Sequence, residues 1–306
     1  MNHAASPSLP VRAQLLSSLS RGTSDLPTLP RGATEALRLA RTTTLDFKEL
    51  ATVAAGDPPL AARIISVANS AAYARAGMQS IASVRHAAIR LGTQTTRDVL
   101  YQVAYASMFA DAPRHGQLIE ATFAHGVTVG RVARLLARDH GLDGDVAFLA
   151  GLLHDIGRAR CWKVISQLRD PVTEADSLPV VDELHVRAGT ELAVAWHLPV
   201  EVIEACRFHH DPGDRSVARI IAACDAIARS TESRGTVDEA RDALLAMGVP
   251  KERVEEALER TTLEATRACG CGPTARGLGR TSRPLRRRRP ASPRGWPSTP
   301  RANRTR

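Results

Sequence analysis

The segment over residues 145–160, DVAFLAGLLHDIGRAR, is the feature that most limits what this chain can fold into. It is apolar on most faces, which predicts a helix buried in the centre of a protein core. Two polar residues, His154 and Asp155, interrupt it. Burying an unpaired carboxylate is costly, and a bound metal ion would remove that cost. The segment therefore predicts a central helix that carries part of a metal site.

The rest of the chain also has helical patterning. Asp57 followed by two prolines is typical of an N-cap and a first helical turn. Thr236 and Glu239 have the spacing of a capping box. No useful run of alternating apolar and polar residues predicts a strand, and aromatic residues make up only 4% of the chain. We therefore expect an all-α fold. The predicted helices cover residues 60–71, 81–91, 118–140, 145–160, 200–210 and 216–230, with two short helices after 236.

Composition divides the chain into a folded part and two terminal segments. Residues 265–306 contain twelve Arg, no Lys and no acidic residue, and subtracting these charges from the net +9 leaves −3 for residues 1–264. Such a Gly-, Pro- and Arg-rich tail is expected to be disordered. The predicted organisation is a poorly ordered N-terminus (1–24), one domain (25–264) and the tail (265–306). Within the domain we expect an N-terminal helical lobe (25–115), a metal-site lobe (116–235) and C-terminal helices (236–264).

Histidines and aspartates in the middle of the chain are the candidates for chemistry. They recur at intervals that fit one helix and its loop, so antiparallel helices could bring them to one level of a bundle. Imidazole and carboxylate ligands suit divalent Fe, Mn, Zn or Ni, and a carboxylate can bridge two ions. Two such ions could activate water and hold a phosphoryl group. The predicted metal ligands are His125, His154, Asp155, His185, His209, His210 and Asp225.

Simpler explanations exist for each of these residues taken alone. A single His on a helix is more often a surface or hydrogen-bonded core residue, and His209-His210 could be an ordinary helix end. Asp225 could be a buried cap or ion-pair partner. Arg158, one turn beyond the His-Asp pair, could hold a phosphate or be a solvated cation. The apolar setting of His154 and Asp155 favours the metal site.

The motifs resemble the HD superfamily, and specifically its HDOD branch. Residues 151–158, GLLHDIGR, are similar to the central HD motif, and the other candidate ligands match the family's upstream and downstream positions. The segments 54–71 and 81–92 are similar to the N-terminal lobe of HDOD proteins. The resemblance runs from about Leu26 to Leu263.

This resemblance implies an all-α fold and a role in bacterial signalling or regulation. Many HDOD proteins have lost ligand histidines, whereas all seven positions are filled here. The expected function is a regulatory protein that contacts other signalling proteins and has kept a two-metal site. The alternative is an active metal-dependent phosphohydrolase on a nucleotide or cyclic dinucleotide, with Asp155 bridging and Arg158 on the phosphate. Asp211-Pro212-Gly213 follows the His pair in place of a Gly-Tyr-Pro loop, which counts against cleavage of cyclic di-GMP.

Location and further partners are predicted from the ends of the chain and its cysteines. The five cysteines are odd in number and have no framework spacing, which favours a reducing, cytoplasmic compartment. We expect no signal peptide and no membrane span, because no run of about 18 apolar residues occurs. Four consecutive arginines at 286–289 could attract nucleic acid, but a solvated tail is the favoured interpretation.

Overall fold

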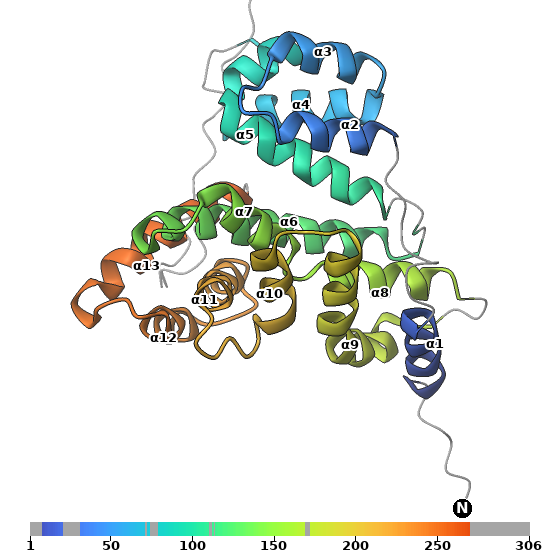
Figure 1. Cartoon of the computed structure of the whole chain (residues 1–306), viewed down its shortest axis with the longest axis vertical. Coiled ribbons are helices and arrows are strands. Elements are labelled where there is room, and N and C mark those ends of the chain that lie inside the picture. Colours follow the sequence, from blue (N-terminus) through green and yellow to red (C-terminus); the bar gives the residue numbers. More distant parts are fainter. Residues whose placement is uncertain are drawn as a thin grey trace, which may run out of the picture. The chain divides into compact units, whose positions relative to one another are not determined.

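In the computed structural model of the protein, every regular element is a helix within the described residues (Figure 1). The described residues are 8–20, 31–70, 72–73, 79–109, 112, 114–168 and 172–269. The all-α prediction is confirmed for this part of the chain. The predicted tail lies outside the described residues from position 270 onward, and nothing in the structure tests its disorder.

A first group of helices forms the N-terminal lobe. Asp57 accepts a hydrogen bond from the Leu60 amide, as the N-cap prediction required. Asn69 both donates to and accepts from the Ile81 backbone, which ties the end of one helix to the start of the next. Gly92, with φ of 76°, kinks the last helix. These helices are α2 (Arg31–Ala40), α3 (Phe47–Ala55), α4 (Pro58–Asn69) and α5 (Val84–Ser107).

A second group of helices carries the candidate ligands. The capping box predicted at Thr236 and Glu239 is present at the start of α12. Short 3-10 turns follow α6 and precede α13. The helices are α6 (Gly116–Ala137), α7 (Gly144–Leu153), α8 (Ile156–Ser166), α9 (Glu174–Ala195), α10 (Val200–Phe208), α11 (Ser216–Thr231), α12 (Val237–Met247) and α13 (Val254–Cys269).

The single helix predicted over 145–160 is wrong, because the chain breaks at the His-Asp pair. His154 is the C-cap of α7 and Asp155 is the N-cap of α8, with φ of −102° and ψ of 14° at Asp155. Apolar patterning on both sides of the pair conceals this break. The break places His154 and Asp155 at the junction between two buried helices.

Two terminal helices lie in or extend into segments for which the sequence predicted no helix. Helix α1 (Ser8–Ser20) lies within the N-terminal segment whose composition predicted poor order. Val11 and Leu15, one turn apart, are buried in its packing against α8 and α9. At the other end, α13 extends five residues beyond the predicted boundary at 264 and buries Ala265. In both cases the packing of one or two buried apolar residues, Val11 and Leu15 in α1 and Ala265 in α13, stabilises a helix that composition alone did not predict.

Glycines allow the helices around the His-Asp pair to approach closely. A Cβ atom on Gly157 in α8 would collide with the carbonyl oxygen of His185 in α9. On the other side, a Cβ on Gly130 in α6 would lie 2.6 Å from the Phe148 carbonyl oxygen in α7. The Gly that follows Ile156 in the motif is thus required for contact between α8 and α9.

The two helix groups meet through a buried ion pair. Arg134 of α6 donates two hydrogen bonds of 2.9 Å to Asp98 of α5. The Asp98 side chain is only 5% exposed. Such a bidentate pair fixes the orientation of the two helices. No helix in the described part of the chain is long and apolar enough to cross a membrane.

Candidate metal centre

All seven predicted ligands converge on one level of the second helix group. We call this set of side chains the His/Asp cluster. His125 comes from the middle of α6, His154 and Asp155 from the α7–α8 junction, and His185 from α9. His209 and His210 follow α10, and Asp225 lies in α11. Neighbouring imidazole rings in the cluster have centroids 4.1–5.6 Å apart.

Asp155 is the centre of the His/Asp cluster, because it belongs to two groups of possible metal ligands. The ligand atoms within each group lie within 4.8 Å of one another. One Asp155 oxygen lies 3.4 Å from Nε2 of both His185 and His209. The other oxygen lies 3.8 Å from His154 Nε2. The groups are Asp155, His185, His209 and His210, and His125, His154 and Asp155.

Three histidines direct the lone pair of Nε2 toward Asp155. His154, His185 and His209 each have Nδ1 within 2.8–2.9 Å of a backbone carbonyl oxygen of the preceding turn. A carbonyl can only accept, so Nδ1 carries the proton in the neutral ring and Nε2 carries the lone pair. Nε2 of His154 and His209 and one Asp155 oxygen are buried without any hydrogen-bond partner. Lone pairs that face a carboxylate with no proton between them fit a bound cation.

The pair His185 and His210 differs from the other two histidines, because a proton on His210 Nε2 can be donated to His185 Nε2. Their Nε2 atoms are 2.9 Å apart, and His185 Nε2 is a lone-pair atom when Nδ1 donates to the Asp182 carbonyl. The pKa of His210 is lowered to about 4, mainly by burial and to a smaller extent by the neighbouring His209 and His185. Burial also lowers the pKa of His154 to about 4. Both rings are therefore neutral near pH 7, as metal ligands must be.

His125 differs from the other histidines because both ring nitrogens face carboxylates. Nε2 lies 2.9 Å from Asp225, and Nδ1 lies 3.1 Å from Glu232. Burial disfavours the charged ring, but the hydrogen bonds to Asp225 and Glu232 outweigh it and raise the pKa of His125 to about 9. This half of the cluster holds a proton that metal ligation through Nε2 would release.

Carboxylates of the cluster stay ionised although they are buried. Burial opposes ionisation of Asp155, but His154, His209 and Arg158 hold its pKa well below the usual range. Arg158 donates to Asp155 over 2.9 Å and to Asp182 over 2.6 Å. Arg158 thus lies at the cluster, with its charge shared between two carboxylates.

Sequence reasoning missed Glu232, which orients His125 from the C-terminal end of α11. It lies 107 residues from His125, in a polar helix end where Glu is common. Its only sequence signal is a position two turns beyond Asp225, on the same face of α11.

Solved structures with a similar fold cover most of the chain. A candidate metal-dependent phosphohydrolase from Shewanella amazonensis SB2B has a TM-score of 0.59 at 22% identity, covering 87% of this chain and 100% of that one. An HDOD domain protein from Geobacter sulfurreducens has a TM-score of 0.54 at 22% identity, covering 85% and 97%. These similarities establish the fold.

Sequence comparisons match about a third of the chain to individual proteins and a longer segment to a domain family. Ribonuclease Y of Lactobacillus gasseri is 32% identical over 106 residues, which are 34% of this chain and 16% of that protein. Ribonuclease Y of Thermus thermophilus is 34% identical over 119 residues, which are 38% of this chain and 18% of that protein. The chain therefore matches less than a fifth of the length of these relatives. The sequence profile of the HDOD domain matches residues 26–212, which is more than half of the chain. The chain belongs to the HDOD domain family.

Proposed function

We propose that this HDOD protein is a regulatory protein whose His/Asp cluster binds two divalent metal ions. The observation that supports the proposal is that Nε2 of His154, Nε2 of His209 and one oxygen of Asp155 lie close together, buried and without any hydrogen-bond partner. A protein core does not leave several lone pairs facing a carboxylate unless a cation compensates them.

The ligand groups define how two ions would be held. One ion would bind His185, His209 and His210, and the other would bind His125, His154 and Asp225, with Asp155 shared. Arg158 holds the shared carboxylate in place, and Glu232 orients His125. When bound, the ions would supply positive charge and Lewis acidity at the exposed edge formed by His210.

A regulatory role is favoured over catalysis by the state of Arg158. It is the cation next to the shared carboxylate, and Asp155 and Asp182 already neutralise it. An arginine committed to two carboxylates is not available to hold a phosphoryl group. We infer that the metal-loaded domain acts through contacts with other signalling proteins. Three buried free thiols, Cys161, Cys206 and Cys224, support a reducing cytoplasmic compartment.

Metal analysis of the full chain tests the proposal. Protein purified under metal-replete anaerobic conditions should retain metal, and His154→Ala should lose most of it. His140→Ala is the matched control, because His140 lies outside the cluster, in the 3-10 turn that follows α6. Less than about 0.2 metal ion per wild-type chain would contradict the proposal, since ligands preorganised in this way bind tightly.

Phosphodiester hydrolysis is the second candidate function. All seven positions are filled, and the chain shares a segment of about a third of its length with proteins named ribonuclease Y. Manganese- or iron-loaded protein should then cleave RNA or a cyclic dinucleotide, and His154→Ala should abolish the cleavage. Metal-loaded protein that is inert toward both would leave the regulatory function.

A further inference from the structure

A second polar region lies between the two helix groups, and Glu232, the partner of His125 in the His/Asp cluster, is one of its lining residues. It is a cavity of about 290 Å³ lined by α4, α5, α6, the end of α11 and α13, and we call it the arginine cavity. This volume is near the lower end of the range for small-molecule sites, about 300–1,000 Å³. The cavity can therefore accept a compact ligand.

Three arginines from three different helices line the arginine cavity: Arg63 of α4, Arg131 of α6 and Arg267 of α13. Arg131 is 14% exposed and donates to the Tyr73 hydroxyl over 2.9 Å. Arg63 and Arg267 form no hydrogen bond or ion pair with any residue that the structure describes. Both residues are exposed, so two guanidinium groups at one cavity have donors that face solvent.

The carboxylates in the same wall are already neutralised by groups other than Arg63 and Arg267. Asp98 receives two hydrogen bonds from Arg134. Glu232 is paired with Arg234 and with His125. The cavity therefore has an excess of unpaired positive charge although acidic residues line it.

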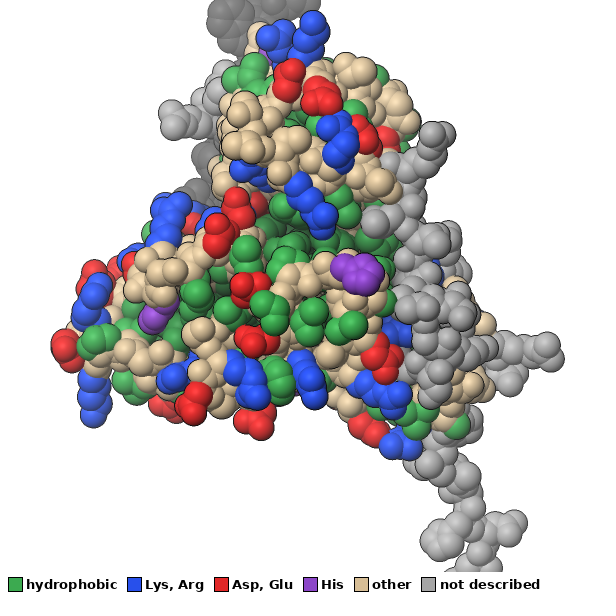
Figure 2. All heavy atoms as spheres, in the orientation of Figure 1, with side chains coloured by type: hydrophobic (Ala, Val, Ile, Leu, Met, Phe, Trp, Pro, Cys, Tyr) green, Lys and Arg blue, Asp and Glu red, His purple; other side chains and the backbone are tan. Residues whose placement is uncertain are grey.

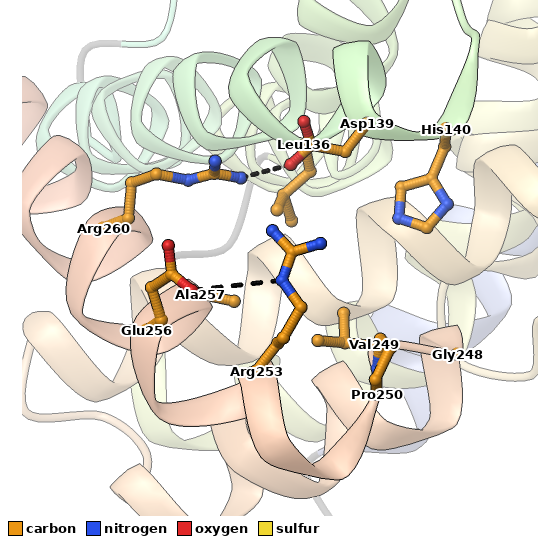
Figure 3. Close-up of a pocket in the computed structure, with 10 residues that line it drawn as sticks. All are labelled: Leu136, Asp139, His140, Gly248, Val249, Pro250, Arg253, Glu256, Ala257 and Arg260. Atoms are coloured by element: carbon orange, nitrogen blue, oxygen red, sulfur yellow. Dashed lines mark hydrogen bonds and ion pairs between the residues drawn. The ribbon is translucent and has the colours of Figure 1, made fainter.

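Another pocket shows that this arrangement is not general. The pocket between the end of α6 and α13 also contains two arginines, but each is paired within the pocket (Figure 3). Arg260 contacts Asp139, and Arg253 lies 3.9 Å from Glu256. Elsewhere, on the face of the molecule in Figure 2, acidic and basic side chains are interspersed.

We propose that the arginine cavity binds a small organic phosphate of about mononucleotide size. Arginines match phosphate oxygens with paired donors, and the hydroxyls of Tyr73, Ser66 and Ser70 and the amide of Gln102 suit a polar ligand body. The proposal does not rest on the metal site. Because Glu232 belongs to the wall and also holds His125, a bound ligand lies one residue away from the His/Asp cluster.

Calorimetric titration of the full chain with nucleoside 5′-monophosphates and with inorganic phosphate tests this inference. The wild type should bind a monophosphate more tightly than inorganic phosphate, and Arg63→Gln/Arg267→Gln should weaken that binding at least about tenfold. Arg253→Gln/Arg260→Gln, in the pocket of Figure 3, is the matched control and should bind as the wild type does. Titrations in about 150 mM salt suppress unspecific binding to the Arg-rich segment after 270.

Three outcomes overturn the inference. They are no monophosphate binding, equal losses in the two double variants, and equal affinities for monophosphate and inorganic phosphate. Metal content separates this inference from the proposed function. Arg63→Gln/Arg267→Gln should keep its metal, whereas His154→Ala should lose metal and still bind the monophosphate.

Discussion

The His/Asp cluster and the arginine cavity are two polar regions of one domain with opposite electrostatic needs. In the cluster, Nε2 of His154, Nε2 of His209 and one Asp155 oxygen are buried acceptors without a proton donor, which fits the proposed cations. In the cavity, Asp98 and Glu232 are paired whereas Arg63 and Arg267 are not, which fits the proposed anion. Glu232 touches both regions. The comparison shows that the cluster has buried acceptors without donors, whereas the cavity has exposed arginine donors without protein acceptors.

Replacing Asp155 by Asn should have the largest effect, because Asp155 is shared by both ligand groups. An amide cannot bridge two cations as a carboxylate does. We expect metal affinity to fall by more than about 100-fold. This exceeds the roughly 10–100-fold loss that is typical when a residue that hydrogen-bonds a metal ligand is replaced. Metal content by atomic spectroscopy is the measurement, and monophosphate binding should not change.

Asp182→Asn is the control for Asp155→Asn. Asp182 pairs with the same Arg158, but its side chain is 52% exposed and it belongs to neither ligand group. It should keep nearly all of its metal. Equal metal loss in the two variants would mean that the Arg158 network, and not the bridging carboxylate, holds the ions.

Replacing Glu232 by Gln should affect the two regions in opposite directions. Loss of the charge behind His125 should weaken metal binding by about tenfold, as expected for an outer partner. The same change removes a negative charge from the arginine cavity, so monophosphate binding should strengthen slightly. Glu256→Gln, on the exposed pocket of Figure 3, should change neither. If Glu232→Gln weakens both metal binding and monophosphate binding, the substitution acts by local unfolding and not through opposite effects of charge.

The sequence predicted the residues that converge in the cluster but not the backbone break that presents two of them. Spacing by one helix and a loop was enough to group His125, His185 and Asp225, because helix length fixes where each turn returns. The break at His154 and Asp155 was not predictable from patterning, since Leu153 and Ile156 continue the apolar run across it. The break depends on packing of α8 against α9, which is a tertiary effect.

The arginine cavity could not be predicted from the sequence at all. Arg63, Arg131 and Arg267 are separated by many residues and each resembles an ordinary solvated cation on a helix. Only the contacts in the structure show that Asp98 is taken by Arg134 and that Arg63 has no described partner. Sequence spacing can predict which residues on successive helices come together. Which charged residues of the two helix groups pair with one another can be seen only in the folded structure.

Gly157→Ala should cause a moderate loss of stability together with a loss of metal. The added methyl group would collide with the His185 carbonyl and push α9 away from Asp155. Overpacking of this kind costs about 1–3 kcal/mol of unfolding free energy. Chemical denaturation measures the stability, and metal content reports the displaced His185.

Gly116→Ala is the matched control, because a Cβ at Gly116 meets nothing within 4 Å. It should stay within about 0.5 kcal/mol of the wild type, as exposed substitutions do. If Gly157→Ala is equally mild, α8 and α9 are not held together by this close approach.

Truncation at the C-terminal end should give the smallest effects and separate the two regions once more. Removing residues 270–306 should change the unfolding free energy by less than about 0.5 kcal/mol and leave both metal content and monophosphate binding intact. A cut after Leu263 also removes two residues of α13, the buried Ala265 and Arg267 of the arginine cavity. It should keep the metal but lower stability by about 1 kcal/mol and weaken monophosphate binding. If the shorter deletion alone abolishes monophosphate binding, the arginines beyond residue 269 bind the phosphate, and the arginine cavity does not.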